Sequence, residues 1–216
     1  MHIVIYDLDR TLTRRPTFTP FLHYAAWRIA PWRLAFSPAW IALMALYRLG
    51  LFSRTTLKRL GMRVMLGSAD LDALAEAGAA FARWRIAGGG LASATLRLVE
   101  EDRQRGARVL IATAAFEFYA QAFAGALGIE DVIGTRWDGR RIPGGNCYGE
   151  TKKARVLAWM AERGLEPDCL TLRFVSDSFA DAPLLELADE PIFVTSSPAA
   201  ARRARARGWQ VFDPAI

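Results

Sequence analysis

Apolar runs and helical patterns alternate along much of the chain. The first run, residues 2–6, is rich in β-branched residues and passes directly into the polar stretch 7–13. A short run of this kind is typical of a buried parallel strand that opens into a loop. We therefore predict a strand over residues 2–6 with a polar loop at its C-terminal end.

From residue 91 onward, short apolar strands and amphipathic helices follow one another. The predicted strands cover residues 108–113, 132–135, 170–176, 192–195 and 210–212. The predicted helices cover residues 91–104, 117–127, 151–163, 181–188 and 198–207, and residues 136–148 form a loop or hairpin. Alternating strands and helices predict an α/β, Rossmann-like parallel sheet with helices on both faces.

The pattern is different between the first strand and residue 91. Residues 18–67 are aromatic and aliphatic and are broken by Pro and Gly, which favours several short helices. Residues 70–86 form a more regular amphipathic helix that ends at three consecutive glycines, 88–90. The expected organisation is a core of residues 1–13 and 91–216, with a helical cap at residues 14–90 inserted after the first strand.

Composition restricts the chemistry that the chain can perform. The 216 residues are 52% hydrophobic and 23% charged, which excludes a disordered or fibrous protein. Only two Cys and two His occur, which excludes a disulfide scaffold, a Cys-rich zinc module and a site built from several His. Carboxylates, hydroxyls and cations must therefore carry most of the chemistry.

Charge is distributed unevenly. The net charge is +6, yet the stretch from residue 10 to residue 69 contains no Asp or Glu. Its ten basic residues are Arg10, Arg14, Arg15, Arg28, Arg33, Arg48, Arg54, Lys58, Arg59 and Arg63. Such a segment indicates an anionic partner, which the sequence leaves open as substrate phosphates, lipid headgroups or nucleic acid.

Polar residues of complementary types follow three of the predicted strands. Their positions are Asp7, Asp9 and Thr11 after the first strand, Thr113 after the second, Asp177, Ser178 and Asp181 after the fourth, and Lys152 in the first turn of a helix. Each alone is more typical of a turn, a helix cap or a solvated surface. Because the carboxyl ends of parallel strands share one crevice, their joint occurrence predicts a single site.

Taken together, these residues resemble the four motifs of the haloacid-dehalogenase-like (HAD) phosphatases. The motifs are Asp7-x-Asp9-x-Thr11, Thr113, Lys152 and Asp177-x-x-x-Asp181, and they span nearly the whole chain. Residues 146–152 and 176–178 resemble the branch that includes phosphoserine phosphatases and phosphatidylglycerophosphatase C. That branch carries a helical cap between the first and second motifs, in agreement with residues 14–90.

The resemblance implies a role for each motif residue. Asp7 would be the nucleophile, Asp9 the acid and base, and Thr113 and Lys152 the ligands of the phosphoryl oxygens, while Asp7, the carbonyl of Asp9 and Asp177 would bind Mg²⁺. Thr11, Ser178 and Asp181 would support the site, and Arg10, Arg14 and Arg15 would face substrate or cap. Lys153, adjacent to Lys152, competes for the catalytic role. Arg10 and Ser176 depart from the family, which commonly has Gly at both positions.

The insertion carries the information on substrate and partner. Trp27, Trp32 and Trp40 lie within fourteen residues, and residues 34–47 form an uncharged run too short to cross a bilayer. The segment is either the apolar core of a cap or an element that docks on an anionic membrane, and nucleic acid is not expected. The start of the chain lacks the pattern of a secretory signal, so we expect a peripheral protein on the cytoplasmic face.

The preferred function is a Mg²⁺-dependent phosphomonoesterase that acts on a lipid phosphomonoester such as phosphatidylglycerophosphate. Phosphoserine is disfavoured because no acid follows the first motif before Asp70, whereas phosphoserine phosphatases carry a Glu there that meets the substrate ammonium. Two alternatives stay open: a phosphatase of a small soluble phosphomonoester such as phosphoserine, and a non-catalytic, membrane-bound phosphate-binding module.

Overall fold

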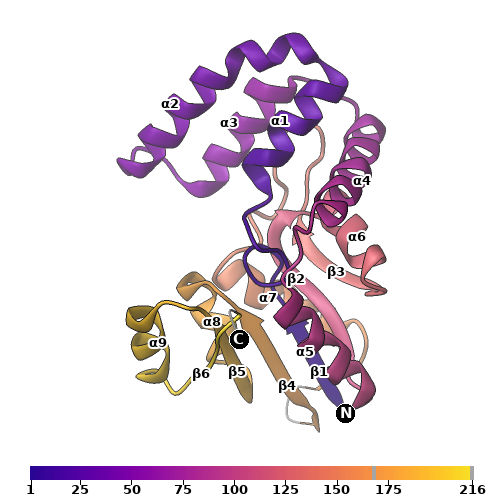
Figure 1. Ribbon diagram of the computed structural model, residues 1–216, viewed down its shortest axis with the longest axis vertical. Coiled ribbons are helices and arrows are strands. Elements are labelled where there is room, and N and C mark those ends of the chain that lie inside the picture. Colours follow the sequence, from indigo (N-terminus) through magenta and orange to yellow (C-terminus); the bar gives the residue numbers. More distant parts are fainter. Residues whose placement is uncertain (167–168, 215–216) are drawn as a thin grey trace.

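The protein is built on a six-stranded sheet, and its computed structural model describes residues 1–166 and 169–214 (Figure 1). All strand pairs are parallel, in the order β3-β2-β1-β4-β5-β6. The strands are β1 (His2–Tyr6), β2 (Arg108–Phe116), β3 (Asp131–Thr135), β4 (Thr171–Ser176), β5 (Glu190–Val194) and β6 (Gln210–Phe212). This is the strand order of a Rossmann-like fold, so the predicted fold class is confirmed.

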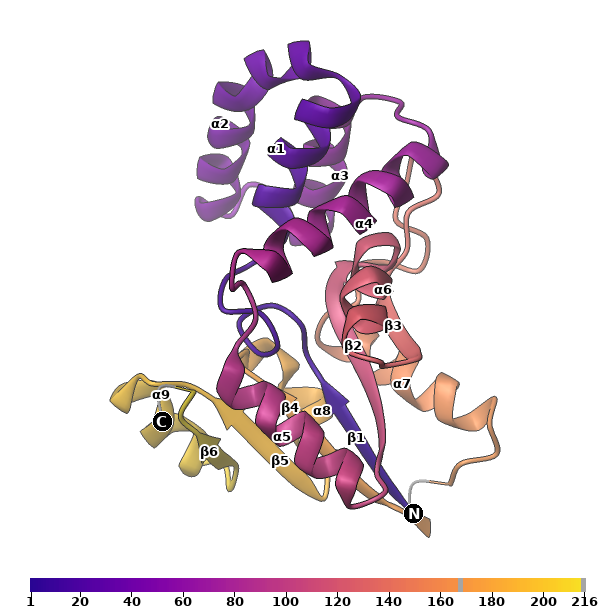
Figure 2. The same ribbon diagram turned by 45° about the vertical axis from the view of Figure 1, so that its right-hand side comes forward.

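Helices cover both faces of the sheet (Figure 2). They are α5 (Ser93–Gln104) on one face, and α7 (Glu150–Ala161), α8 (Ala182–Leu185) and α9 (Pro198–Arg205) on the other. The central strand β1 serves both layers: Val4 and Tyr6 belong to the apolar cluster that includes Val99 of α5, and Ile3 and Ile5 to the cluster under α7 and α8. Burial on both faces explains why β1 is apolar at every position after His2.

Residues 14–90, which we call the insert, lie beyond the C-terminal ends of the strands. The insert contains α1 (Phe18–Ile29), the 3₁₀ helix η1 (Pro31–Phe36), α2 (Ser37–Arg48), α3 (Arg54–Leu66) and α4 (Leu71–Ala87). Helix α4 packs against α6 (Glu117–Ala126) so closely that a Cβ added to Gly78 would lie 2.9 Å from the Cβ of Tyr119. The several short helices agree with the sequence, while the treatment of the insert as a separate cap domain stays a prediction.

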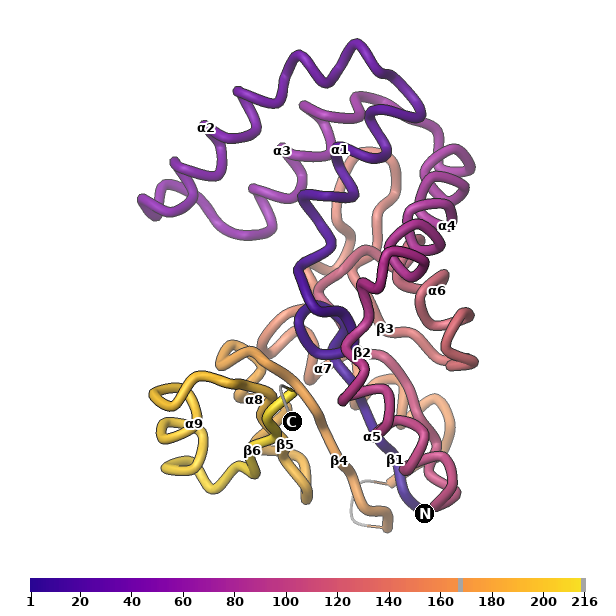
Figure 3. The backbone as a smooth tube through the Cα atoms, in the orientation of Figure 1, coloured from indigo at the N-terminus to yellow at the C-terminus, as the bar shows by residue number. Residues whose placement is uncertain are grey.

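Two linkers join the insert to the sheet, and they run side by side (Figure 3). The amide of Arg14 donates to the carbonyl of Gly90 at 2.9 Å, and the amide of Ala92 donates to the carbonyl of Leu12 at 2.9 Å. The chain therefore enters and leaves the insert at the same place, immediately after the loop that carries Asp7 and Asp9.

The structure differs from the predicted elements at two points, and at residues 136–148 it shows the loop rather than the hairpin of the two predicted forms. β2 continues to Phe116, three residues beyond its predicted end, and its pairing with β3 shifts register between Ala112 and Phe116. The described loop 136–148 contains no hairpin strands. The predicted helix 181–188 is a 3₁₀ turn, η3 (Phe179–Asp181), followed by α8, because the Ser178 hydroxyl accepts from the amide of Ala180 and starts the turn earlier.

Candidate active site

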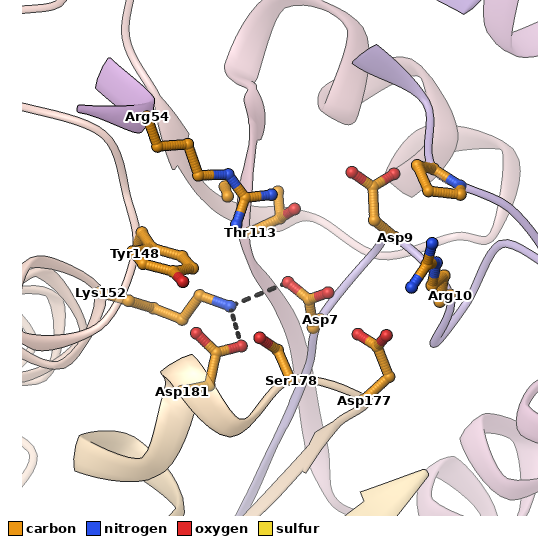
Figure 4. Close-up of a pocket in the computed structure, with 12 residues that line it drawn as sticks. Asp7, Asp9, Arg10, Arg54, Thr113, Tyr148, Lys152, Asp177, Ser178 and Asp181 are labelled. Carbon is orange, nitrogen blue, oxygen red and sulfur yellow. Dashed lines mark hydrogen bonds and ion pairs between the residues drawn. The ribbon is translucent and has the colours of Figure 1, made fainter. Parts of the chain in front are cut away.

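A pocket of about 240 Å³ opens where β1, β2 and β4 end. Most of its lining residues are polar, and they come from separate stretches of the chain (Figure 4). They are Asp7, Asp9, Arg10, Pro16, Arg54, Thr113, Ala114, Tyr148, Lys152, Asp177, Ser178 and Asp181, from the five stretches 7–16, 54, 113–114, 148–152 and 177–181. The predicted convergence of strand ends therefore occurs, because parallel strands end at one edge of the sheet.

Lys152 is the centre of the charged network. Its ammonium donates to Asp7 Oδ1 at 2.8 Å and to Asp181 Oδ2 at 2.6 Å, and its side chain is 1% exposed. Burial alone would lower the pKa of Lys152, but the two carboxylates outweigh it and raise that pKa above its ordinary value. Lys152 therefore stays a cation in contact with Asp7.

Asp7 lies at the bottom of the pocket, directly after β1. Its amide donates to the carbonyl of Val175, which ties the start of the loop to β4. Burial raises the pKa of Asp7 to about 6 against the opposing effect of Lys152, so the carboxylate is ionised at neutral pH. A buried, ionised carboxylate with one oxygen on a lysine suits a nucleophile.

Asp181 is held from two sides. Its Oδ2 accepts from Lys152 and from the hydroxyl of Ser176, the latter at 2.7 Å, while Oδ1 is buried and has no hydrogen-bond partner. The Ser176 hydroxyl also accepts from the amide of Ser178 at 3.2 Å. Ser176, noted as a departure from the family pattern, thus fixes both the lysine's partner and the loop after β4.

Asp177 gives the pocket a surplus of negative charge. Burial and the carboxylate of Asp7 together raise the pKa of Asp177 to about 7 against the opposing effect of Arg10. A buried and a half-buried carboxylate that destabilise each other form a donor set suited to a hard cation such as Mg²⁺. In the described part of the chain no three His, Cys, Asp or Glu side chains group as a metal site. The ligand set implied by the family resemblance needs only two carboxylates and a main-chain carbonyl.

Asp9 and Thr113 face the same pocket. Asp9 Oδ1 accepts from the amide of Thr17 at 2.8 Å, so the carboxylate is oriented by the linker into the insert. The Thr113 hydroxyl accepts from the amide of Ala115 at 3.0 Å. This bond orients the hydroxyl within the stretch where the pairing of β2 with β3 shifts register. Arg10 also lines the pocket, and its φ of 60° places it in the left-handed region where glycine is favoured.

The insert contributes residues that the sequence analysis did not select. Arg54, the first residue of α3, reaches the pocket, and its guanidinium lies 4.7 Å from the ring centre of Tyr148. The sequence carries one sign that Arg54 is unusual. Ser53 caps α3 by accepting from the amide of Thr56, and a cation directly after a helix cap interacts unfavourably with the helix dipole. Tyr148 lies within the motif 146–152, but the sequence analysis assigned no role to it.

Four candidates named from the sequence do not line the pocket. Thr11 is fully buried and its hydroxyl has no partner. Arg14 donates to the carbonyl of Leu91 at 2.9 Å, because it lies between the two linkers, and Arg15 is exposed. Of the two adjacent lysines only Lys152 reaches the pocket, since Lys153 projects from another side of α7. Arg14 and Arg15 therefore lie outside this pocket, which Arg54 lines, and their assignment to substrate or cap stays a prediction.

Comparison with known proteins agrees with this geometry. The family model for haloacid dehalogenase-like hydrolases matches residues 4–186, so the chain belongs to that family. A histidinol-phosphatase from Neisseria meningitidis serogroup C (strain 8013) is 34% identical over 127 residues. That alignment spans 54% of this chain and 56% of the relative.

Solved structures share the fold over the full chain. A protein with unknown function from Bordetella pertussis Tohama I is 28% identical with a TM-score of 0.82, covering 99% of this chain and 98% of that one. A phosphoserine phosphohydrolase-like protein from Francisella tularensis subsp. tularensis SCHU S4 is 16% identical with a TM-score of 0.61, covering 98% and 95%. The second likeness concerns the fold alone, including the helices between β1 and β2.

Proposed function

We propose that the protein is a Mg²⁺-dependent phosphomonoesterase that acts through an aspartyl-phosphate at Asp7. The observation that carries this proposal is the bond of Lys152 to both Asp7 and Asp181 in a pocket also lined by Asp9, Thr113 and Asp177. Phosphoryl transfer depends on positioning and on neutralising charge, and these residues supply both.

The reaction divides into two displacements. An oxygen of Asp7 bonds to phosphorus while the bond to the leaving oxygen breaks, and Asp9 gives its proton to that oxygen. Asp9 then takes a proton from water, whose oxygen attacks phosphorus, and inorganic phosphate and free Asp7 result. Lys152 and Thr113 hold phosphoryl oxygens. Asp7, Asp177 and the carbonyl of Asp9 would hold Mg²⁺, whose charge would offset the repulsion between Asp7 and a phosphate dianion.

Release of inorganic phosphate from para-nitrophenyl phosphate tests the nucleophile. We expect activity with Mg²⁺, its loss on chelation, and its loss in Asp7→Asn. The matched control is Asp138→Asn, an exposed carboxylate outside the pocket whose acceptor oxygen the amide preserves. Activity that survives Asp7→Asn unchanged contradicts the nucleophile, and inactivity of the wild type on every phosphomonoester favours a non-catalytic phosphate-binding module.

The substrate that we favour is a lipid phosphomonoester such as phosphatidylglycerophosphate. The insert side of the pocket presents Arg54 and no carboxylate, so it suits an anionic group beside the phosphate and opposes an ammonium. The relative named histidinol-phosphatase favours the alternative, a small soluble phosphomonoester. A panel of phosphatidylglycerophosphate, phosphatidate, phosphoserine and histidinol phosphate separates the two candidates by kcat/KM.

The exterior of the insert supports a lipid surface as partner. Of the twelve residues of α2, only Trp40 is buried, although the helix is largely apolar. Large apolar side chains exposed on the insert are Trp27, Trp32, Phe36, Ile41, Leu46, Leu49, Leu51, Leu71 and Trp84. Arg28 and Arg48 are exposed near the ends of α1 and α2, and aromatic residues beside arginines suit an anionic membrane interface.

None of the helices in the described residues is long and apolar enough to cross a membrane. We therefore propose peripheral attachment, on the cytoplasmic face, through η1 and α2. Apolar side chains would enter the headgroup layer, and the arginines would contact lipid phosphates.

A further inference from the structure

Helix α3 carries two cations one turn apart, Arg54 and Lys58. Arg54 lines the pocket, whereas Lys58 is buried and is not among the pocket-lining residues. Residues four apart lie on the same side of a helix, so the position of one guanidinium over the pocket depends on how the next turn is held.

Lys58 is buried against the core, with 4% of its surface exposed. Its ammonium donates to the carbonyl of Ala114, in the segment that also carries Thr113, and to Asn146 Oδ1 at 2.9 Å, in the loop before α7. The rings of Phe18 and Phe116 lie 5.5 Å and 5.2 Å from the ammonium. One side chain thus joins α3 to the end of β2 and to the loop before α7, and both segments also contribute residues to the pocket.

The core supplies one other donor to the two acceptors that Lys58 contacts. The hydroxyl of Thr135 lies 2.7 Å from the Ala114 carbonyl and 2.8 Å from Asn146 Oδ1, and its single proton serves one of them at a time. It also accepts from the amide of Cys147 at 3.1 Å. Thr135 therefore joins β2, β3 and the loop before α7 within the core, and Lys58 adds the donors that come from the insert.

The position is electrostatically unfavourable for a lysine. Burial lowers the pKa of Lys58 to about 7, the neighbouring Arg54 adds to the effect, and Asp9, Cys147 and Asp7 oppose it. An apolar side chain of similar length would fit the aromatic walls at lower cost, since burying a charge is expensive unless it is fully paired. A lysine retained here is better explained by what it positions than by stability.

We propose that Lys58 is a positioning residue, which pins α3 to the end of β2 at Ala114 and to the loop carrying Asn146, and so holds Arg54 over the pocket. The inference rests on the proposed phosphatase function, in which Arg54 binds the anionic substrate. It assigns to Lys58 no contact with substrate.

The first test is Lys58→Met, which keeps the length of the side chain and removes its donors. We expect a melting temperature close to that of the wild type, because the loss of a buried charge offsets the one acceptor that loses its donor. We also expect KM for para-nitrophenyl phosphate to rise by about tenfold or more while kcat changes by less than about threefold, the pattern for lost substrate binding. Arg59→Met, an exposed neighbour on the same helix, is the matched control and should leave both constants unchanged.

A double-mutant cycle distinguishes positioning from a general structural role. Arg54→Met should raise KM strongly in the wild type and only slightly in Lys58→Met, because Arg54 is already displaced there. Additive effects of the two changes overturn the proposal, as does a Lys58→Met protein with a lower melting temperature and unchanged KM.

Hydrogen exchange of the α3 amides supplies a readout that needs no activity. Exchange in α3 should be faster in Lys58→Met than in Arg59→Met, with α4 unchanged because α4 is held by α6. If the wild type proves inactive, the proposed function fails while this measurement still decides the contact. Equal exchange in the two variants overturns the role of Lys58.

Discussion

At the scale of single residues, burial and charge distinguish two adjacent lysines. Lys152 is almost fully buried between Asp7 and Asp181, whereas Lys153 lies outside the pocket. The two lysines are adjacent in sequence, so the sequence alone left the choice between them open. The structure resolves the placement because α7 begins at Glu150 and directs only its third residue toward β1.

We expect replacement by Met to lower activity strongly at Lys152 and little at Lys153. We expect Lys152→Met to lower kcat by about 10² to 10³, the usual loss when a charge that stabilises the transition state is removed. Lys153→Met should change kcat little. Phosphate release measures both, and circular dichroism is needed because Lys152→Met leaves two buried carboxylates unpaired, at a stability cost of about 3 to 5 kcal/mol. Equal losses in two folded variants would contradict the assignment.

Asp9 provides a second residue-scale prediction. Asp9→Asn keeps the oxygen that accepts from the amide of Thr17 but cannot donate a carboxylic proton. Turnover of an alkyl phosphate should fall by about 10² to 10⁴, the range for acid–base catalysis. A phenyl phosphate with a low-pKa leaving group should lose less, because its leaving oxygen needs no proton. A variant that hydrolyses alkyl phosphates at a near-normal rate argues against this role.

Which site residues the sequence could predict depends on where they lie. Asp7 and Asp177 directly follow strands and Thr113 lies near the end of β2, all in one parallel sheet, so topology alone brings them together. Arg54 reaches the pocket from a distant helix, and no local pattern specifies how the insert is placed over the sheet. Arg14 was assigned to substrate or cap, and its hydrogen bond to the carbonyl of Leu91 shows that it also joins the two linkers.

At the scale of elements, two glycines differ in how much space surrounds them in the packed helices α4 and α6. Gly78 of α4 would place a Cβ 2.9 Å from Tyr119 Cβ and 3.1 Å from the carbonyl of Phe118, neither of which moves easily. Gly125, within α6, has nothing within 4 Å of such an atom. The same substitution therefore has opposite consequences in two helices that pack together.

We expect Gly78→Ala to lower the free energy of unfolding by about 1 to 3 kcal/mol through overpacking. Gly125→Ala should raise it by up to about 1 kcal/mol, because alanine favours a helix more than glycine does. Urea denaturation followed by circular dichroism measures both. A Gly78→Ala protein as stable as Gly125→Ala would mean that α4 and α6 are not in close contact.

The elements themselves were largely predictable because buried parallel strands are continuous apolar runs, as in β1. The loop 136–148 was less predictable, since Asp138-Gly139 is typical of a hairpin turn. In the structure Asp138 Oδ1 accepts from the amides of Arg140 and Arg141, at 2.8 Å and 2.6 Å. These two bonds satisfy backbone amides of the turn within the loop itself, and flanking strands do not form.

At the scale of the whole molecule, cations and exposed apolar side chains lie on the same part of the chain. We expect cosedimentation with vesicles that contain phosphatidylglycerol and little binding to neutral vesicles at low salt. Each engaged basic residue contributes about 1 kcal/mol, and this part should weaken as salt rises while apolar insertion persists. Ile41→Ser combined with Leu49→Ser should abolish the salt-resistant part.

Leu71→Ser is the control for that experiment, because Leu71 is an exposed leucine at the start of α4, outside η1 and α2. It should bind vesicles as the wild type does. Negligible binding of the wild type to both kinds of vesicle would leave η1 and α2 as ordinary parts of the insert and would favour a soluble substrate.

Arg10 has a consequence for how such a protein evolves. Its left-handed backbone conformation costs an ordinary residue about 1 to 2 kcal/mol that glycine avoids. A laboratory selection for heat resistance should therefore enrich Arg10→Gly, and the survivors should lose a cation that lines the pocket. The chain keeps arginine where folding alone would choose glycine, so a lineage released from the need for this pocket should drift to glycine at position 10 early.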